Sequence, residues 1–278
     1  MNRTGYQDRL AEVLAGHSAA KVGYPIGLRE LTVLRRTAVG SGIVRVTFGG
    51  PELAGFVSHV PDEHVRLIFP DSDGVLRLPE RDGLSLRWSA PRPVSREYSV
   101  RRFDAEGGEL DIEFVIHPGG LASEWAARAE PGARIHIAGP PGGVVVPDSY
   151  DRYLLAGDIT ALPAIARWLE MLPRDARGWA IVEVADESEQ VTLDAPAGLD
   201  VQWLHRGDAA PGSTDLLEKA IRTLVLPSGE RIYIWISGEA GSIRPLRRWV
   251  RAEVTSERCD HLITGYWKRG TADYGDPD

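Results

Sequence analysis

The stretch Arg96-Glu-Tyr-Ser99 carries side chains suited to a planar, phosphorylated cofactor. The guanidinium of Arg96 can grip a pyrophosphate with several donors at once. The ring of Tyr98 can lie against a planar group, and the hydroxyl of Ser99 can bond a ring nitrogen. The same tetrapeptide is also typical of an ordinary strand with one polar face, so it points to a cofactor only together with a second site.

The second site is the run 117–125, which is expected to pass from a strand through a loop into a helix. Gly119 and Gly120 let the backbone come close to a phosphate. The helix opening near Ala122 and Ser123 supplies unpaired amide donors and the positive end of a helix dipole. A Gly-Gly pair before a helix is also typical of a simple turn. The order and separation of the two sites nevertheless favour a flavin cradle.

Composition limits the class of protein. A chain of 278 residues with 43% hydrophobic and 26% charged residues predicts two soluble globular domains, each with its own core. The net charge of -8 argues against general nucleic-acid binding. A single cysteine, Cys259, excludes an internal disulfide, a four-cysteine zinc site and an iron–sulfur cluster held by this chain. No nucleophile elbow and no metal-ligand cluster stands out, so neither a catalytic side chain nor a metal site is predicted.

No apolar run approaches the roughly 20 residues of a membrane span, and the first residues lack a signal-peptide core. These features predict a cytoplasmic protein without membrane insertion, and we expect a monomer. Residues 1–28 are interpreted as a leader in which Leu10, Val13 and Leu14 form one side of a short amphipathic helix.

Short β-like runs follow, separated by glycine and proline turns. Strands are expected at 31–37, 43–48, 64–69, 97–103, 110–116 and 133–138, with one helix at 121–129. This pattern predicts an antiparallel β-barrel over residues 29–146 as the flavin-binding domain. The Pro-Gly-rich run 139–143 marks the exit from the barrel.

After residue 147 strands and helices alternate. Strands are expected at 153–156, 179–184, 201–204, 232–236 and 261–264, and helices at 161–172, 215–224 and 243–254. The alternation predicts that residues 147–278 form an α/β domain, a parallel sheet with helices on both faces that resembles nucleotide-binding domains.

Ligands of open parallel sheets bind outside the carboxyl ends of the strands. The loop 157–163 would lie there, with Asp158 facing a ligand and Thr160 as a plausible N-cap of the following helix. A second loop with Glu239 would lie at the end of a neighbouring strand. The first loop is also typical of a well-capped turn with no ligand, and it is not a Gly-x-Gly-x-x-Gly fingerprint.

The C-terminal run Gly265-Tyr-Trp-Lys-Arg-Gly270 carries two aromatic rings and two cations. Lys268 and Arg269 are candidates for attracting an anionic substrate, with Arg101 and Arg102 as a second choice. Ordinary packing of the last strand explains the run equally well.

With these motifs in order, the chain resembles the siderophore-interacting protein family, flavin-containing ferric-siderophore reductases related to ferredoxin–NADP reductases. The likeness covers residues 31–270. It is carried by Asp62-Glu-His-Val, Arg96-Glu-Tyr-Ser99, Ala122-Ser-Glu-Trp125, Leu155-Ala-Gly-Asp158, Thr160-Ala-Leu-Pro-Ala-Ile165, Trp203-Leu-His-Arg206, Gly238-Glu-Ala240 and Gly265-Tyr-Trp267.

The resemblance implies that FAD lies against the barrel domain and that the nicotinamide side of the second domain faces the loops 158–163 and 238–240. The implied cofactor-binding residues are Arg96, Tyr98, Ser99, His117, Gly119, Gly120, Ala122, Ser123, Trp125, Asp158, Thr160, Ala161, Glu239, Ala240 and Trp267. The sequence departs from the family pattern at Ile159, where an acid is usual, and at Leu121, where a proline is usual. Its phosphate loop is also about one residue shorter. The first departure bears on the choice of reductant.

The function expected from the resemblance is reduction of a ferric siderophore by FAD, with electrons from NADH, NADPH or a reduced ferredoxin. The substrate is the chelate, and a ferredoxin is a possible protein partner. Two alternatives stay open at the level of the sequence: a general flavin reductase or diaphorase, and a siderophore-binding module without catalysis.

Overall fold

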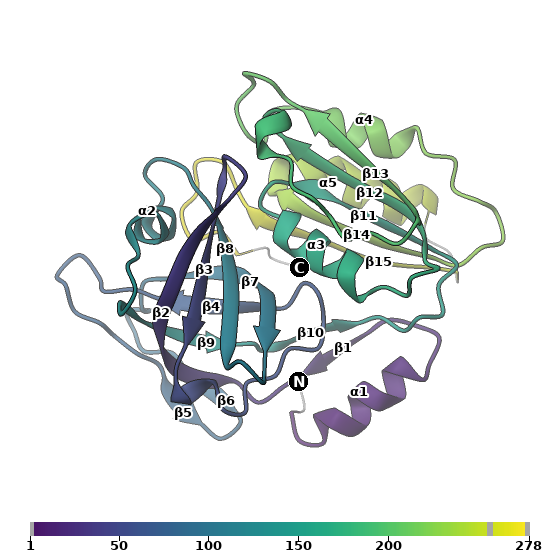
Figure 1. Cartoon of the computed structure of the whole chain (residues 1–278). Helices are drawn as coiled ribbons and strands as arrows, with labels where there is room; N and C mark the ends of the chain where they lie inside the picture. The colour runs from purple at the N-terminus through teal and green to yellow at the C-terminus, as the bar shows by residue number, and fades with distance from the viewer. Residues whose placement is uncertain (1–2, 255–257, 276–278) are drawn as a thin grey trace. The chain divides into compact units, whose positions relative to one another are not determined.

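The computed structural model describes residues 3–254 and 258–275, and most of its strands lie in a closed barrel or in a five-stranded parallel sheet (Figure 1). The chain divides into two compact units. The first contains the residues up to Ala15 together with Ala20–Val146, and the second contains Gly16–Ala19 together with the residues from Pro147 onward. The first unit is built on a closed barrel and the second on an open parallel sheet.

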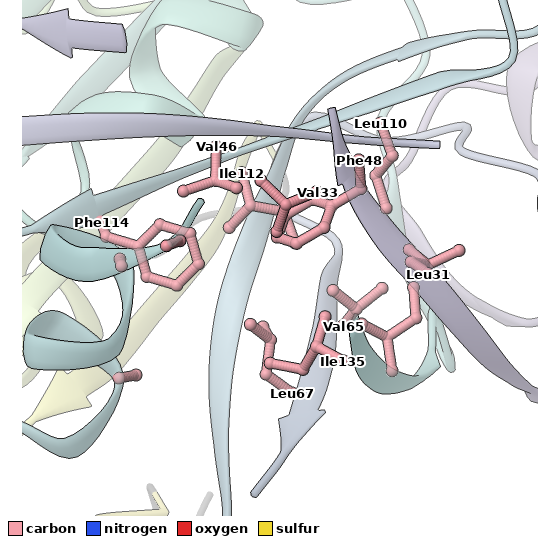
Figure 2. Packing of buried hydrophobic residues seen from close by; sticks show 14 of the residues in the cluster. Leu31, Val33, Val46, Phe48, Val65, Leu67, Leu110, Ile112, Phe114 and Ile135 are labelled. Carbon is pink, nitrogen blue, oxygen red and sulfur yellow. The ribbon is translucent and has the colours of Figure 1, made fainter. Parts of the chain in front are cut away.

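All neighbouring strands of the barrel are antiparallel, as predicted. Its order is β2 (Gly27–Val39), β3 (Ile43–Gly49), β8 (Glu109–Val115), β7 (Ser95–Asp104), β4 (His64–Ile68) and β9 (Arg134–Gly139), with β9 pairing back to β2. Side chains alternate along each strand, so Leu110, Ile112 and Phe114 of β8 point into one core (Figure 2). Closure removes the exposed strand edges that an open sheet would leave.

The helix α2 (Leu121–Arg128) packs against the same core through Ala122 and Ala126. Two alanines four residues apart lie on one side of the helix and let it approach the strands closely. The loop before α2 is thereby fixed to the barrel, which matters for the site described below.

The first residues are part of the first unit. The helix α1 (Tyr6–Leu14) packs through Leu10 and Val13, and β1 (Ala20–Gly23) pairs with β10 (Gly142–Val145). Leu14 was expected on the apolar side of this helix, but its side chain is 52% exposed. Three smaller elements complete the unit: η1 (Pro51–Leu53) and the hairpin of β5 (Glu80–Asp82) and β6 (Ser85–Arg87).

The second unit has five parallel strands, again as predicted. Their order is β13 (Gly198–His205), β12 (Arg177–Val184), β11 (Arg152–Asp158), β14 (Ile232–Glu239) and β15 (Cys259–Trp267). The helix α3 (Leu162–Met171) covers one face, where the ring centroids of Trp168 and Tyr233 lie 5.6 Å apart. The other face packs against α4 (Leu216–Arg222) and α5 (Ala240–Trp249), which continues as a π-helical turn at Val250–Val254. The turn η2 (Glu187–Glu189) connects β12 and β13.

Candidate functional site

The three predicted ligand residues of β7 lie at different depths. Arg96 is partly exposed and donates from Nη1 to the carbonyl of Ser95 at 2.7 Å. Ser99 is partly exposed and lies opposite His64 of β4. Tyr98 packs against the barrel core, and burial raises the pKa of its hydroxyl to about 12. The phenol therefore stays neutral and presents only part of its ring.

A row of aromatic rings connects β7 to α2 (Figure 2 shows Phe114 in the core). The ring of Tyr98 lies 4.4 Å from that of Phe114, and Phe114 lies 6.1 Å from Trp125. Trp125 also stacks on Phe48, with an interplanar angle of 6°. Trp125 was predicted to bind the cofactor, and its indole packs against the rings of Phe48, Phe69 and Phe114. Its clear contribution is to hold α2 at a fixed distance from the strand of Tyr98.

The loop between β8 and α2 is fastened by one hydroxyl. Ser123 is buried; its Oγ accepts from the amide of His117 at 2.7 Å and donates to the carbonyl of His117 at 2.9 Å. The ring of His117 lies over Gly120, where a Cβ would come within 2.5 Å of it. Gly119 has a φ of 76°, which favours glycine, and no atom lies within 4 Å of its Cβ position.

The first amides of α2 are open. Among residues 3–254 and 258–275, no acceptor meets the amides of Leu121, Ala122 or Ser123, since the chain's first bond here runs from Glu124 to the carbonyl of Gly120. Open amides and the positive helix end form a natural binding place for a phosphate. The only acidic side chain of this first turn, Glu124, is turned back to accept from the amide of Gly119 at 3.2 Å.

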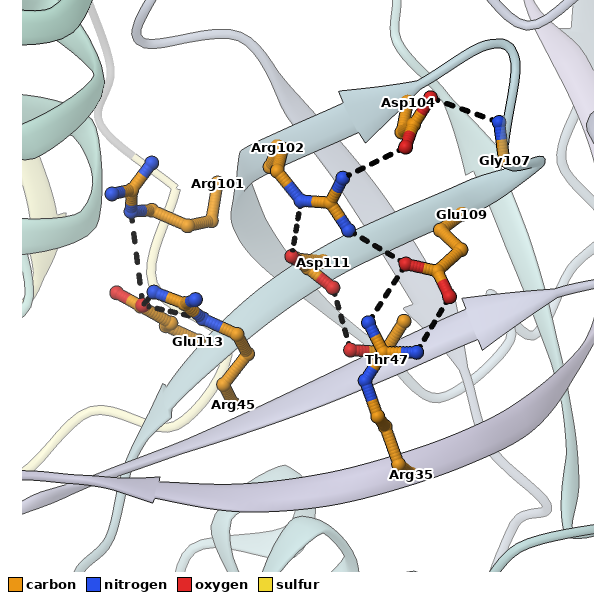
Figure 3. Close-up of polar contacts among 10 residues, drawn as sticks. All are labelled: Arg35, Arg45, Thr47, Arg101, Arg102, Asp104, Gly107, Glu109, Asp111 and Glu113. Atoms are coloured by element: carbon orange, nitrogen blue, oxygen red, sulfur yellow. Dashed lines mark hydrogen bonds and ion pairs between the residues drawn. The ribbon is translucent and has the colours of Figure 1, made fainter.

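The arginines beside β7 belong to a network of ion pairs on the side of the strands away from the core (Figure 3). Arg102 donates to Asp111 and Glu109 at 2.7 Å and to Asp104 at 3.2 Å. Arg35 from β2 grips both oxygens of Glu109 at 2.5 and 2.7 Å. All three donor nitrogens of Arg102 are thus occupied by carboxylates.

The same network continues to Glu113. This buried carboxylate accepts from Arg45 at 2.5 Å and lies 3.7 Å from the Nε of Arg101. Arg101 and Arg102 were the second choice for a basic substrate pocket. Their charges are neutralised within the barrel, so they are poor candidates for attracting an anionic chelate. They stabilise the pairing of β7 with its neighbours instead.

In the second unit, one carboxylate joins the ends of three strands. The Oδ1 of Asp158 accepts from the amide of Thr160 at 2.9 Å and from its hydroxyl at 2.5 Å. Its Oδ2 accepts from the amide of Glu239 and from the indole of Trp267, both at 2.8 Å. Burial raises the pKa of Asp158, while the four donors oppose that rise. Four predicted site residues therefore do meet, with Asp158 as their common acceptor.

The surroundings of Asp158 leave little room. A Cβ on Gly238 would lie 2.8 Å from its Oδ2. A Cβ on Gly157 would lie 2.3 Å from the carbonyl of Ser237 and 2.4 Å from the Cβ of Ala161. Both glycines are required because the ends of β11 and β14 approach each other closely.

Two local expectations were wrong. Thr160 does not cap α3, because the N-cap is Ala161 and Thr160 donates to Asp158. The expected loop around Glu239 is absent, since β14 runs to Glu239 and α5 starts at Ala240. Glu239 is itself the cap: its Oε2 accepts from the amide of Ser242 at 2.7 Å.

The loop 206–214 was missed at the level of the sequence. Thr214 donates to the buried Glu183 at 2.7 Å, and Ser242 donates to the carbonyl of Gly212 at 3.0 Å. A Cβ on Gly212, whose φ is 67°, would lie 2.5 Å from Glu239. The Pro211-Gly212 dipeptide is a turn signal, but nothing in it indicates contact with Glu239 at the end of a strand later in the chain.

The two cations predicted for the substrate lie just after β15. Lys268 and Arg269 are exposed, and within the described ranges neither forms an ion pair with a carboxylate. The backbone amide of Arg269 donates to the Oε1 of Glu239 at 3.1 Å, which leaves its guanidinium available. The tail is therefore tied to the strand ends through its backbone while its charges face solvent.

Comparison with known proteins agrees with this architecture. Residues 32–144 match the siderophore-interacting FAD-binding domain, and residues 150–270 match the siderophore-interacting protein model. The chain belongs to the siderophore-interacting protein family. It is 34% identical to the ferric vibriobactin reductase ViuB of Vibrio cholerae over 250 residues, which cover 87% of this chain and 90% of that one.

Two further relatives of the family illustrate the same match. The NADPH-dependent ferric-chelate reductase of Escherichia coli is 35% identical over 237 residues, covering 84% of this chain and 90% of that one. The crystal structure of a siderophore utilization protein from T. fusca superimposes with a TM-score of 0.86 at 41% identity, covering 92% of this chain and 98% of that one. The family matches thus extend over both units.

The first unit fits an FAD on structural grounds. The open amides of α2 and the guanidinium of Arg96 are donors of the kind that a diphosphate requires, and the open space beside Gly119 allows its approach. The partly exposed ring of Tyr98 adds an apolar surface. Around Asp158, by contrast, the amides of Thr160 and Glu239 already donate to its carboxylate.

The ion-pair network predicts a pH dependence. Hydrogen bonds from Arg35 and then Arg102 lower the pKa of Glu109 from 4.5 to about 2. A lowered carboxyl pKa stabilises the fold above the unfolded value near 4.5, and that contribution disappears as the pH falls through about 2. Glu109→Gln should therefore lower the denaturation midpoint at pH 7, and the difference from wild type should shrink between pH 4.5 and pH 2.

Urea titrations at several pH values measure this difference. Glu106→Gln is the matched control, because Glu106 is an exposed glutamate in the turn between β7 and β8, directly before the strand that begins with Glu109. A difference for Glu109→Gln that stays constant down to pH 2 would contradict the assignment.

Proposed function

We propose that this protein is an FAD-dependent reductase of ferric siderophores that takes electrons from NADH or NADPH. The observation that carries the proposal is the start of α2, where open amides, two glycines and a fixed serine form a phosphate cradle on the barrel. Support for the substrate comes from the family, whose relatives include the vibriobactin and ferric-chelate reductases named above.

In this proposal each residue of the first unit has one task. Arg96 and the amides of Leu121, Ala122 and Ser123 bind the diphosphate, with Gly119 and Gly120 allowing the approach. Tyr98 and Ser99 contact the flavin ring, and His117 borders it. Bound FAD supplies the conversion between a two-electron donor and one-electron acceptors.

The balance of the reaction is simple. A reduced nicotinamide gives up one hydride, which carries two electrons, and becomes the oxidised pyridinium. Two chelated Fe(III) ions each take one electron and become Fe(II), and one proton is released. Fe(II) is held less tightly than Fe(III) by hard oxygen ligands, so the siderophore can lose its iron.

Three finer points belong to the same proposal. A reduced ferredoxin is an alternative donor, and the family departure at Ile159 is the reason to test it. We propose a monomer, and we propose the cytoplasm, where reduced nicotinamide nucleotides are available. No helix among residues 3–254 and 258–275 is long and apolar enough to cross a membrane.

The decisive experiment is a visible spectrum of the purified protein without oxygen. Bound flavin bands should bleach on addition of NADH or NADPH and return when a ferric siderophore is added, with formation of Fe(II). If the protein reduces free flavin or dyes but no ferric siderophore, a general diaphorase is favoured. Absence of flavin binding would favour a non-catalytic module and overturn the proposal.

The diphosphate contact can be tested at Arg96. Arg96→Ala should remove a charge-assisted hydrogen bond of about 1.5–3 kcal/mol and weaken FAD binding roughly ten- to a hundredfold. Calorimetric titration of apoprotein with FAD measures the effect. Arg128→Ala removes an exposed arginine from the last turn of α2 and should leave the affinity unchanged. Equal affinities of both variants and wild type would remove Arg96 from the site.

The role of the two exposed cations in attracting the substrate can be tested by removing their charges. Lys268→Gln combined with Arg269→Gln should raise the KM for an anionic ferric siderophore roughly threefold or more at low salt and flatten its salt dependence, because steering by exposed charges is screened. Turnover of a neutral chelate should not change. The control with the same net charge is Arg244→Gln combined with Arg248→Gln, two exposed residues of α5. An equal rise in KM for both pairs would mean that only net charge matters.

A further inference from the structure

In the second unit, three consecutive amides are already hydrogen-bonded at the place where a dinucleotide diphosphate would normally bind. In an open parallel sheet that place is the turn from the first strand into the following helix. Here the turn lies between β11 and α3. The amide of Thr160 donates to the side chain of Asp158, the amide of Ala161 to the carbonyl of Asp158, and the amide of Leu162 to the carbonyl of Ile159.

The next two residues supply nothing further. Pro163 has no amide hydrogen, and Ala164 is fully buried. The amides of Thr160, Ala161 and Leu162 are therefore used by the chain itself, in contrast to the open amides at the start of α2. The two helix starts differ because β11 ends in the carboxylate of Asp158, whereas only a proline and two glycines lie between His117 and α2.

The charge at this sheet edge also disfavours a diphosphate. Asp158, Glu183 and Glu239 are all buried, with exposed fractions of 8%, 5% and 5%. Asp158 and Glu183 face each other on adjacent strands, and Asp158 bonds the amide of Glu239. Hydrogen bonds from the amides of Arg269 and Ser242 hold the pKa of Glu239 below its usual value in spite of burial, so this group stays ionised. These buried carboxylates disfavour a diphosphate at the strand ends, while the exposed cations Lys268 and Arg269, just after β15, act in the opposite sense at the surface.

We propose that this protein accepts reduced nicotinamide donors without binding their diphosphate, so that reduced nicotinamide mononucleotide is a donor comparable to NADH. The inference rests on the proposed function, because it concerns how the donor of that reaction is recognised. The redox balance is unchanged: bound FAD would accept the hydride that the donor loses, together with one solvent proton. The difference lies in which part of the donor the protein binds: the diphosphate is not bound.

The first test measures binding rather than activity. FAD-loaded protein is titrated calorimetrically with ADP and with adenosine, which differ only by the diphosphate. We expect ADP to bind no more tightly than adenosine, or neither to bind at the concentrations used. The positive control is the apoprotein titrated with FAD and riboflavin, where the open amides of α2 should favour FAD by about a hundredfold or more. ADP binding at least tenfold tighter than adenosine overturns the proposal.

The second test measures hydride transfer. Flavin reduction is followed anaerobically by stopped flow with NADH and with reduced nicotinamide mononucleotide. We expect second-order rate constants within tenfold of each other. A loss larger than tenfold for the mononucleotide overturns the proposal, since the protein would then depend on the missing half of the donor.

These results are distinguishable from a failure of the proposed function. If dithionite-reduced protein reduces a ferric siderophore but no nicotinamide compound reduces the flavin, the inference fails and the reductase function stands. If both nicotinamide donors reduce the flavin equally but the reduced protein leaves ferric siderophores untouched, the inference stands and the substrate class is wrong.

Discussion

The second unit depends on one buried carboxylate that four donors saturate. Asp158 ends β11 and binds the start of α3, the end of β14 and the indole that ends β15. Removing this acceptor would leave several buried donors without a partner, each costing about 1–3 kcal/mol. The same bonds that make the sheet edge stable also consume the donors that a phosphate would need. Stability and ligand recognition therefore compete for the same few atoms.

In the first unit, the start of the helix α2 is left open for a ligand because other interactions provide the stability of the unit. Its stability comes from aromatic packing inside the barrel and from ion pairs outside it, so the start of α2 is not needed to hold strands together. Ser123 fixes the loop through the backbone of His117 alone. The helix start can stay open because other interactions hold it in place, which is the usual condition for a preorganised binding site.

Periodicity predicted the architecture because it reports burial. Alternation in runs such as residues 110–116 and helical spacing in residues 161–172 reflect single faces of single elements, and both units formed as predicted. The side-chain roles were harder to predict, since they depend on contacts between distant segments. The packing of Trp125 against Phe48 and Phe114 could not be foreseen from its motif, and Thr160, predicted as a cap, donates to Asp158 instead. The role of Gly212 needed the fold, because its neighbour Glu239 is far along the chain.

The tight fit around Asp158 also limits how such a domain can change over generations. Gly157 and Gly238 admit no side chain, and Asp158 shares its oxygens with Thr160 and Trp267. A substitution at any one of these positions leaves the partners of the others unsatisfied, so single steps toward a phosphate-binding loop pass through destabilised proteins. A lineage that has adopted this carboxylate is therefore expected to keep it, and to alter its choice of electron donor through surface residues that the strand ends do not use.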